Sequence, residues 1–377
     1  MSAASDERDR VSTLELFFDL VFVFTITQLT GVLAHHPDGE HLLQVALMLT
    51  VIWWMYGGFV WLTNAVATDT TRRRLLLLGG MACFMVISLS IPTAFSGDGE
   101  IFAGAYLAVI LVHAALFTRS WNAEAARAIL TTVRFNLAAA LLILAGALIG
   151  DEPWEYILWG LGALAAISTT WLQDSTRFRI QPSHFVERHG LVVIVALGES
   201  VVAVGIGASG QELTAGVLGV AVAGLALSAA LWWSYFEVED EAGAAFAAVP
   251  DEHRAQQALT SYYFAHLLLL GGVIAVAAGL EEGIAHPYDT ASLGIALCLS
   301  GGAAAYFAGE VAFRRSLGIA HGAWLGVAGL VALATVPLGT AGSALLQLVV
   351  LLAAVVACLV AEAGSTRRLI EASPEAG

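Results

Sequence analysis

The chain has 377 residues, of which 58% are hydrophobic and only 12% are charged. This charged share is about half of that in soluble globular proteins, so the composition excludes an ordinary soluble domain and predicts a protein embedded in lipid. A net charge of −15 without a basic patch excludes a nucleic-acid partner. The three cysteines lie in apolar runs without CxxC spacing, and no Gly-rich phosphate loop, GxSxG or HExxH motif occurs. We therefore expect no cofactor and no metal site.

Twelve apolar runs follow one another along the chain, separated by short polar turns. A helix needs about 20 mostly apolar residues to cross a hydrocarbon layer about 30 Å thick. The pattern therefore predicts an all-α, polytopic integral membrane protein of about twelve transmembrane helices without a separate soluble domain. The longest connection, after the eighth span, is acidic and is interpreted as a solvated linker. The predicted spans are 14–33, 42–64, 74–95, 101–118, 128–149, 154–172, 185–207, 213–236, 258–280, 290–308, 319–337 and 342–362.

The basic residues are all arginines, and they lie in or beside alternate connections between these spans. Cytoplasmic connections carry the excess of basic residues in membrane proteins. The pattern therefore predicts that both termini lie in the cytoplasm, and it supports an even number of spans. The 16 arginines are Arg8, Arg10, Arg72, Arg73, Arg74, Arg119, Arg127, Arg134, Arg177, Arg179, Arg188, Arg254, Arg314, Arg315, Arg367 and Arg368.

Two pairs of similar segments indicate an internal duplication. The pattern Trp-Trp-x-Tyr occurs at 53–56 in the second span and at 232–235 in the eighth, and LLLLGG occurs at 75–80 in the third and at 267–272 in the ninth. Chance recurrence in so apolar a chain is the alternative. An even number of helices per repeat makes the halves parallel, related by an axis along the membrane normal, and such halves often enclose a site at mid-membrane. The predicted six-helix halves are 1–180 and 181–377.

The seventh span carries more titratable groups than a membrane anchor needs. At about 100° per residue, Glu187, His184, Arg188 and Glu199 fall within an arc of about 120°, and His189 lies outside it. Glu199 is eleven residues beyond Arg188 and therefore about 16 Å deeper. Because an ionisable group at that depth normally faces a cavity or a partner, we predict that Glu199 is a coupling carboxylate and that the other three form a network at the cytoplasmic entrance. The alternatives are a neutral Glu199 that serves helix packing and a salt-bridge network at the membrane surface.

The first span begins with two acids four residues apart, Glu15 and Asp19, which lie on one face of a helix. They are expected at the cytoplasmic entrance, where they could attract cations or accept hydrogen bonds from Arg188. A capped first turn with Ser12 or the next threonine as N-cap would explain Glu15 but not Asp19.

Four further polar residues within the spans are secondary candidates. A lone polar residue in an apolar helix usually has a structural role, but histidines change charge near neutral pH and could line a proton path. Under the duplication, Gln28 corresponds to Glu199, although it lies on the opposite side of its helix from the two acids. The four are His113, Asn136, His266 and Gln28.

Two motifs together carry a family resemblance. ELFFDLVFVFTITQL, which begins at Glu15, and HFVERHGLVVIVALGES, which begins at His184, resemble in order and spacing the motifs of the bacterial low-temperature-requirement protein A (LtrA) family. The resemblance covers nearly the whole chain and implies a polytopic inner-membrane protein whose family name refers to growth in the cold. It implies no catalytic or ligand role for any residue. The matching positions are Glu15, Phe17, Phe18, Asp19, His184, Glu187, Arg188, Gly190, Gly198 and Glu199.

The leading functional hypothesis is a secondary transporter, or a related permeation pathway, coupled to protons or a small cation. A membrane-embedded enzyme acting on lipid, with His184, Glu187 and His189 in acid–base roles, is the second hypothesis. A non-catalytic membrane factor for growth in the cold is the third. The expected partners are membrane lipid and a proton or small cation, and neither the substrate nor the oligomeric state follows from the sequence.

Overall fold

The computed structural model describes residues 11–65, 70–118, 123–172 and 180–372, and these residues form helices without any strand. The prediction of an all-α polytopic membrane protein is confirmed, because eleven helical stretches among the described residues are long and apolar enough to cross a membrane. Five of the arginines used to predict the orientation lie outside the described residues. They are Arg8, Arg10, Arg119, Arg177 and Arg179.

Every one of the twelve predicted spans coincides with helical structure, but one is not among the eleven apolar stretches. The predicted span 154–172 forms helix α7 (Trp154–Leu172), whose 19 residues include Glu155 and the polar run Ser168-Thr169-Thr170. The number twelve therefore remains a prediction. Several helices begin where a hydroxyl side chain accepts a hydrogen bond from the backbone N–H three residues later, as Ser and Thr N-caps do. Such caps are Thr70, Thr214 and Ser292.

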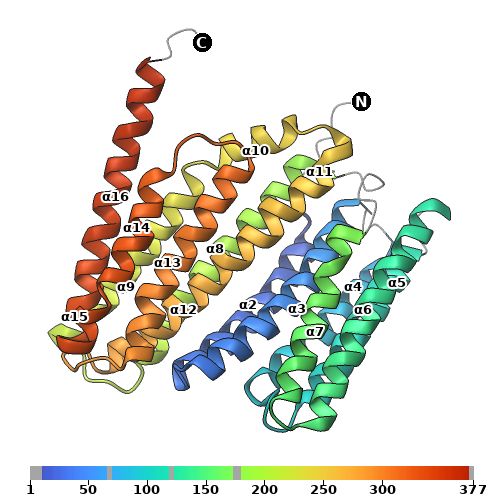
Figure 1. Cartoon of the computed structure of the whole chain (residues 1–377), viewed down its shortest axis with the longest axis horizontal. Helices are drawn as coiled ribbons and strands as arrows, with labels where there is room; N and C mark the ends of the chain where they lie inside the picture. Colours follow the sequence, from blue (N-terminus) through green and yellow to red (C-terminus); the bar gives the residue numbers. More distant parts are fainter. Residues whose placement is uncertain (1–10, 66–69, 119–122, 173–179, 373–377) are drawn as a thin grey trace. The chain divides into compact units, whose positions relative to one another are not determined.

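The described chain forms two compact units (Figure 1). The first contains the residues up to Val32, Glu40–Val192 and Phe246–Leu259. Its centre is helix α3, whose Trp53, Tyr56 and Phe59 are almost completely buried. The helices that lie mainly in this unit are α2 (Thr13–His35), α3 (Gly39–Ala65), α4 (Thr71–Ser90) with the short 3₁₀ turn η1 (Ile91–Thr93), α5 (Gly99–Thr118), α6 (Ala123–Ile149), α7, the first part of α8 (Pro182–Gly207) and α11 (Asp251–Ala258).

The second unit contains Leu33–Gly39, Val193–Ala245 and the residues from Thr260 onward. Five of its helices form a closed ring in which α12 packs on α13, α13 on α14, α14 on α16, α16 on α9 and α9 on α12. The backbones of α12 and α13 approach so closely that a Cβ atom on Gly272 would lie 2.5 Å from the backbone nitrogen of Tyr306, which explains a small residue there. Its helices are the rest of α8, α9 (Ala215–Phe236), most of α10 (Glu239–Ala248), the π-helical turn η3 (Leu259–Phe264), α12 (Ala265–Ala285), α13 (Leu293–Ser316), α14 (Ala323–Ala334), α15 (Val336–Ala341) and α16 (Ala344–Ala372).

The acidic connection after the eighth predicted span, interpreted from the sequence as a solvated linker, is helical, and most of its acidic residues are exposed. It forms α10 and α11, and Val238, Ala242 and Phe246 are buried at intervals of four residues. This spacing places the three apolar side chains on one face, while the acidic residues occupy the other. A helix of this kind attaches to the protein through a narrow apolar stripe.

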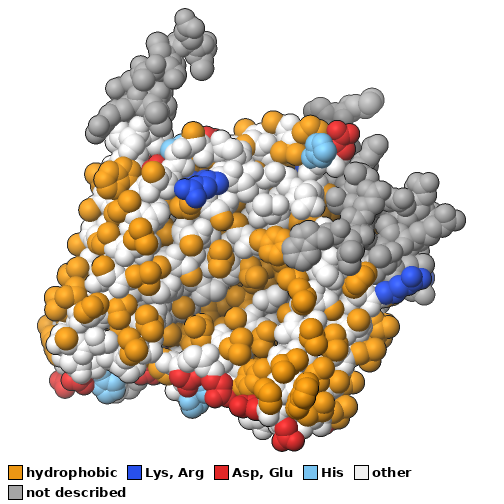
Figure 2. All heavy atoms as spheres, in the orientation of Figure 1, with side chains coloured by type: hydrophobic (Ala, Val, Ile, Leu, Met, Phe, Trp, Pro, Cys, Tyr) orange, Lys and Arg blue, Asp and Glu red, His pale blue; other side chains and the backbone are white. Residues whose placement is uncertain are grey.

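The described surface is rich in large apolar side chains that point away from the protein, among them Leu75, Leu161, Val222 and Leu330. In the view of Figure 2, hydrophobic side chains are spread over the described surface, and acidic side chains lie near the ends of the helices. Exposed apolar surface on this scale is unfavourable in water. It is expected of helices that face lipid.

Candidate functional site

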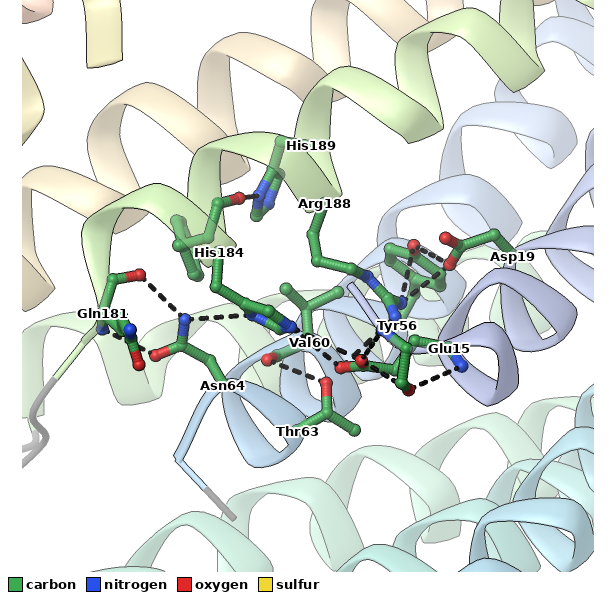
Figure 3. Close-up of polar contacts among 12 residues, drawn as sticks. Glu15, Asp19, Tyr56, Val60, Thr63, Asn64, Gln181, His184, Arg188 and His189 are labelled. Atoms are coloured by element: carbon green, nitrogen blue, oxygen red, sulfur yellow. Dashed lines mark hydrogen bonds and ion pairs between the residues drawn. The ribbon is translucent and has the colours of Figure 1, made fainter. Parts of the chain in front are cut away.

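A cluster of buried charged side chains lies where three helix ends meet in the first unit (Figure 3). Glu15 and Asp19 come from the start of α2, Tyr56 from the second half of α3, and His184 and Arg188 from the start of α8. None of these five residues is more than 5% exposed. We call these five residues the Arg188 cluster.

Asp19 is held through one of its two carboxylate oxygens. Arg188 Nη2 donates to Asp19 Oδ1 at 2.7 Å, and the Tyr56 hydroxyl donates to the same oxygen at 2.6 Å. Asp19 Oδ2 is buried and has no hydrogen-bond partner among the described residues. Since a buried carboxylate oxygen without a donor is costly, Oδ2 is a position that favours a proton.

Glu15 has a structural role and an electrostatic one. Its Oε2 accepts hydrogen bonds from the backbone N–H of Ser12 at 2.8 Å and from the Ser12 hydroxyl at 2.7 Å, which is the capping-box arrangement at a helix start. Its Oε1 lies 3.3 Å from His184 Nε2 and 3.6 Å from Arg188 Nη1. The expected cap and the expected approach to Arg188 are therefore both present.

The position of the proton on His184 follows from its neighbour Asn64. The Asn64 amide accepts from the backbone N–H of Gln181 at 2.8 Å and donates to the Gln181 carbonyl at 2.9 Å, and these two bonds fix which end is oxygen. The amide nitrogen then lies 3.3 Å from His184 Nδ1, which must accept. A neutral His184 consequently carries its proton on Nε2, directed at Glu15.

The acids of the Arg188 cluster outnumber its arginine. Glu15 and Asp19 in their ionised forms contribute two negative charges and Arg188 contributes one positive charge, so with a neutral His184 the cluster carries one excess negative charge. Burying an unbalanced charge is far more costly than burying a balanced pair. The cluster is therefore built to accept one positive charge.

Aromatic rings enclose the side of the cluster formed by Tyr56. The ring centroid of Phe22 lies 4.3 Å from that of Tyr56, and the Trp53 ring stacks on Tyr56 at 5.3 Å. The Phe18 ring lies 5.7 Å away on the same side. These rings exclude water from the hydroxyl, and electrostatic interactions are stronger in such surroundings.

The helical arc predicted for α8 is displaced from the face that the structure buries. Glu187 is exposed and does not belong to the Arg188 cluster, so its place in a network at the entrance remains a prediction. His189, which the arc excluded, is buried; its Nδ1 lies 2.8 Å from the Phe185 carbonyl and its ring packs edge-on against Trp53. The buried face is centred on Phe185, because apolar packing and not the charged residues sets the rotation of the helix.

Glu199 lies outside the Arg188 cluster. It is 1% exposed and belongs to the second unit, eleven residues further along α8. Gln28, its counterpart under the duplication, is half-buried on α2. A role for Glu199 in coupling remains a prediction.

The other secondary candidates occupy separate structural positions. His113 Nε2 lies 3.0 Å from the Gly58 carbonyl, and Asn136 Oδ1 accepts from the Trp54 indole at 2.8 Å. His266 lies in the second unit, with Nε2 2.9 Å from the Tyr235 hydroxyl and Nδ1 2.9 Å from the Ser261 carbonyl. Each polar group therefore has a local hydrogen-bond partner.

Two members of the site were not singled out from the sequence. In the sequence, Tyr56 stands out only as part of the repeated Trp-Trp-x-Tyr pattern. In the structure, its hydroxyl donates a hydrogen bond to Asp19 Oδ1. The sequence offers one indication of a role for Asn64, namely that it is a polar amide near the end of an apolar run. Among the described residues, no group of three or more His, Cys, Asp or Glu side chains is arranged to hold a metal ion.

Comparison with known proteins gives two matches. The family model described as bacterial low temperature requirement A protein (LtrA) matches residues 10–361. A protein of Rhizobium meliloti (strain 1021) with the name uncharacterized protein RA0937 is 27% identical over 329 residues, which cover 82% of this chain and 78% of that protein.

Proposed function

The chain belongs to the bacterial low temperature requirement A protein family, and we propose that it is a proton-coupled secondary transporter, or a related proton permeation pathway, whose proton-binding site is the Arg188 cluster. One observation carries this proposal. Two buried carboxylates share one arginine, and Asp19 Oδ2 lacks a hydrogen-bond partner among the described residues. Intramembrane ionisable groups that remain unbalanced commonly mark ion and proton pathways.

A proton suits this cluster better than a metal cation does. The Arg188 guanidinium lies between the two acids, 2.7 Å from Asp19 and 3.6 Å from Glu15, and its charge would repel a metal ion bound there. A proton on Asp19 Oδ2 needs no additional space and leaves the two donors to Oδ1 in place. The neutral carboxylic acid removes the excess charge.

Protonation of Asp19 would change which acid of α2 attracts Arg188 more strongly. A neutral Asp19 attracts Arg188 less, so the guanidinium is drawn toward Glu15, whose Oε1 also lacks a hydrogen-bond partner among the described residues. Helix α8 starts in the first unit and continues in the second, where it carries Glu199. A change in the contacts of Arg188 would thus act on a helix common to both units, and Glu199 would serve as a second protonatable group on it.

The proposed location is the bacterial inner membrane with both termini in the cytoplasm. The distribution of the 16 arginines over alternate connections supports this orientation. The Arg188 cluster lies at the starts of α2 and α8, and α8 follows a connection that contains Arg177 and Arg179. The site would therefore exchange protons with the cytoplasmic side.

A rapid pH step on proteoliposomes adsorbed to a solid-supported membrane tests the proposal. Proton binding to a buried site displaces charge, so the native protein should give a transient current above that of protein-free liposomes. Asp19→Asn should abolish most of this current because amides do not titrate. Glu187→Gln removes an exposed carboxylate from the same region and should leave the current unchanged.

Two results would contradict proton coupling at this site. The first is a native current no larger than that of protein-free liposomes, and the second is a current that Asp19→Asn leaves intact. In the first case, incubation of the purified protein with a total lipid extract separates the remaining hypotheses. A new lipid product would favour the enzyme, and its absence would favour the non-catalytic membrane factor.

A further inference from the structure

The second unit contains another buried arginine with a full set of partners. Arg314 on α13 donates from Nε to Glu310 Oε1 at 3.0 Å and from Nη2 to the Ser234 carbonyl at 2.6 Å. Its Nη1 lies 3.1 Å from His321 Nδ1. Arg314 and Glu310 are both almost completely buried, and Glu310 Oε2 has no hydrogen-bond partner among the described residues.

His321 connects this buried pair to the protein surface. It lies in the short connection between α13 and α14, and its side chain is 13% exposed. Its Nε2 is 2.8 Å from Oε2 of Glu241, an α10 residue whose side chain is 53% exposed. The charged groups continue from buried Glu310 through Arg314 and His321 to Glu241, which faces solvent.

The hydrogen-bond donors decide the tautomer of His321. An arginine can only donate, so His321 Nδ1 must accept from Arg314 Nη1. The proton of a neutral His321 therefore lies on Nε2 and is donated to Glu241. His184 has the same arrangement in the first unit, with Nδ1 accepting from Asn64 and Nε2 directed at Glu15.

The two clusters share further features. Each contains a buried arginine paired with an acid that has one oxygen without a partner, Asp19 in the first unit and Glu310 in the second. In each unit the arginine also contacts the Trp-Trp-x-Tyr segment, through the Tyr56 hydroxyl in one and the Ser234 carbonyl in the other. Both clusters therefore contain a buried arginine, a histidine and two acids, while the tyrosine hydroxyl of the first is replaced by a backbone carbonyl in the second.

We propose that the second unit has its own proton-binding centre, formed by Glu310, Arg314, His321 and Glu241, in which His321 exchanges protons with water. A proton taken from water binds to His321 Nδ1, and the contact with Arg314 is lost because two donors would then face each other. The new N–H finds an acceptor in Glu362 Oε1 on α16, 4.0 Å away. Arg314 keeps its bonds to Glu310 and Ser234.

The charged groups around this centre favour uptake of the proton. His321 faces Arg314 from α13, Glu241 from α10 and Glu362 from α16, and Glu310 also feels the charge of Glu237. With a neutral His321, the net charge of the groups around it is minus two. Arg314 contributes one positive charge, and the carboxylates of Glu310, Glu241 and Glu362 contribute three negative charges. Protonation of His321 brings the total to minus one.

Glu362 links the protonation state of His321 to a helix start. Its two oxygens accept hydrogen bonds from the backbone N–H groups of Gly322 at 2.7 Å and Trp324 at 2.8 Å, at the beginning of α14. A carboxylate at a helix N-terminus is a favourable partner for those N–H groups. A protonated His321 would compete with these N–H groups for Glu362. Proton uptake would therefore weaken the hydrogen bonds that hold the start of α14 to α16.

Nitrogen NMR of ¹⁵N-histidine-labelled protein in lipid nanodiscs tests this centre without a transported substrate. The His321 signal is assigned by its loss in His321→Gln. At high pH we expect the pattern of an Nε2–H tautomer, and acidification should protonate both ring nitrogens. Glu241→Gln and Glu362→Gln should each move the midpoint of this titration to lower pH by at least half a unit, because each removes a facing negative charge.

The chain offers internal controls. His253 is exposed and pairs only with exposed Glu252, so its titration should not change in either variant. Asp19→Asn should not change the His321 titration either, which keeps this inference separate from the Arg188 cluster. A His321 that stays in one protonation state throughout the acidification, or a midpoint that neither glutamate substitution moves, would overturn the proposal. Glu241 is exposed, so its substitution tests the idea even if Glu362→Gln prevents folding.

Discussion

Arg188 on α8 and Asp19 on α2, 169 residues apart in the sequence, form a buried ion pair of 2.7 Å in which the arginine serves two acids but hydrogen-bonds only one. The second acid, Glu15, lies 3.6 Å from the same guanidinium. Replacing Arg188 would leave both carboxylates without a cation, whereas replacing either carboxylate would leave Arg188 with the other.

Arg188→Gln should destabilise the protein by about 3–5 kcal/mol, because it leaves two buried carboxylates without their cation. Asp19→Asn should cost much less, since Glu15 remains near Arg188 and the charges then balance. The loss of stability in the double variant should be smaller than the sum of the losses in the two single variants, as expected for residues in direct contact. Thermal unfolding in one detergent at fixed pH measures all three. Equal losses for the two single variants would contradict the unequal sharing.

The Tyr56 hydroxyl is expected to contribute through its bond to Asp19. Tyr56→Phe removes a donor to a charged group and should cost about 1.5–3 kcal/mol. Tyr106 is a matched control, since it is equally buried and its hydroxyl has no hydrogen-bond partner among the described residues. Tyr106→Phe should be neutral or slightly stabilising. A larger loss of thermal stability at position 106 than at position 56 would refute this interpretation.

Asn64 should decide the tautomer of His184. In the native protein, ¹⁵N NMR at high pH should show His184 with its proton on Nε2. Asn64→Ala removes the donor to Nδ1, so a mixture of the two tautomers should appear. Asn64→Asp presents an acceptor to Nδ1 and should shift the proton to that nitrogen. A native His184 with the proton on Nδ1 would show that the Asn64 contact is not a hydrogen bond of this kind.

Two neighbouring glycines of α3 should respond differently to the same substitution. A Cβ on Gly58 would lie 3.2 Å from His113 Nε2, whereas a Cβ on Gly57 meets no atom within 4 Å. Alanine is favoured over glycine in a helix by about 1 kcal/mol. Gly57→Ala should therefore be neutral or stabilising, and Gly58→Ala should be less stable than Gly57→Ala because His113 has to move. Melting temperatures of the two variants check this, and equal temperatures would mean that His113 is free to shift.

Much of the architecture could be predicted from local pattern. Each predicted hydrophobic run fell on helical structure, because a helix in lipid must satisfy its backbone hydrogen bonds within itself. The Ser12–Glu15 cap was also predictable, since a capping box involves only residues three apart. The helices α10 and α11 were missed because acidic composition concealed a stripe of only three apolar residues, Val238, Ala242 and Phe246.

The sequence by itself determined that this is a polytopic helical membrane protein with acids and a histidine–arginine pair at the starts of α2 and α8. Only the tertiary structure decided which of those groups meet. It turned Glu187 outward and His189 inward, brought Tyr56 to Asp19, and joined Arg314 to His321. The reason is that the rotation of a helix about its axis depends on the apolar surfaces of its neighbours, and a rotation of one residue exchanges a buried charge for an exposed one.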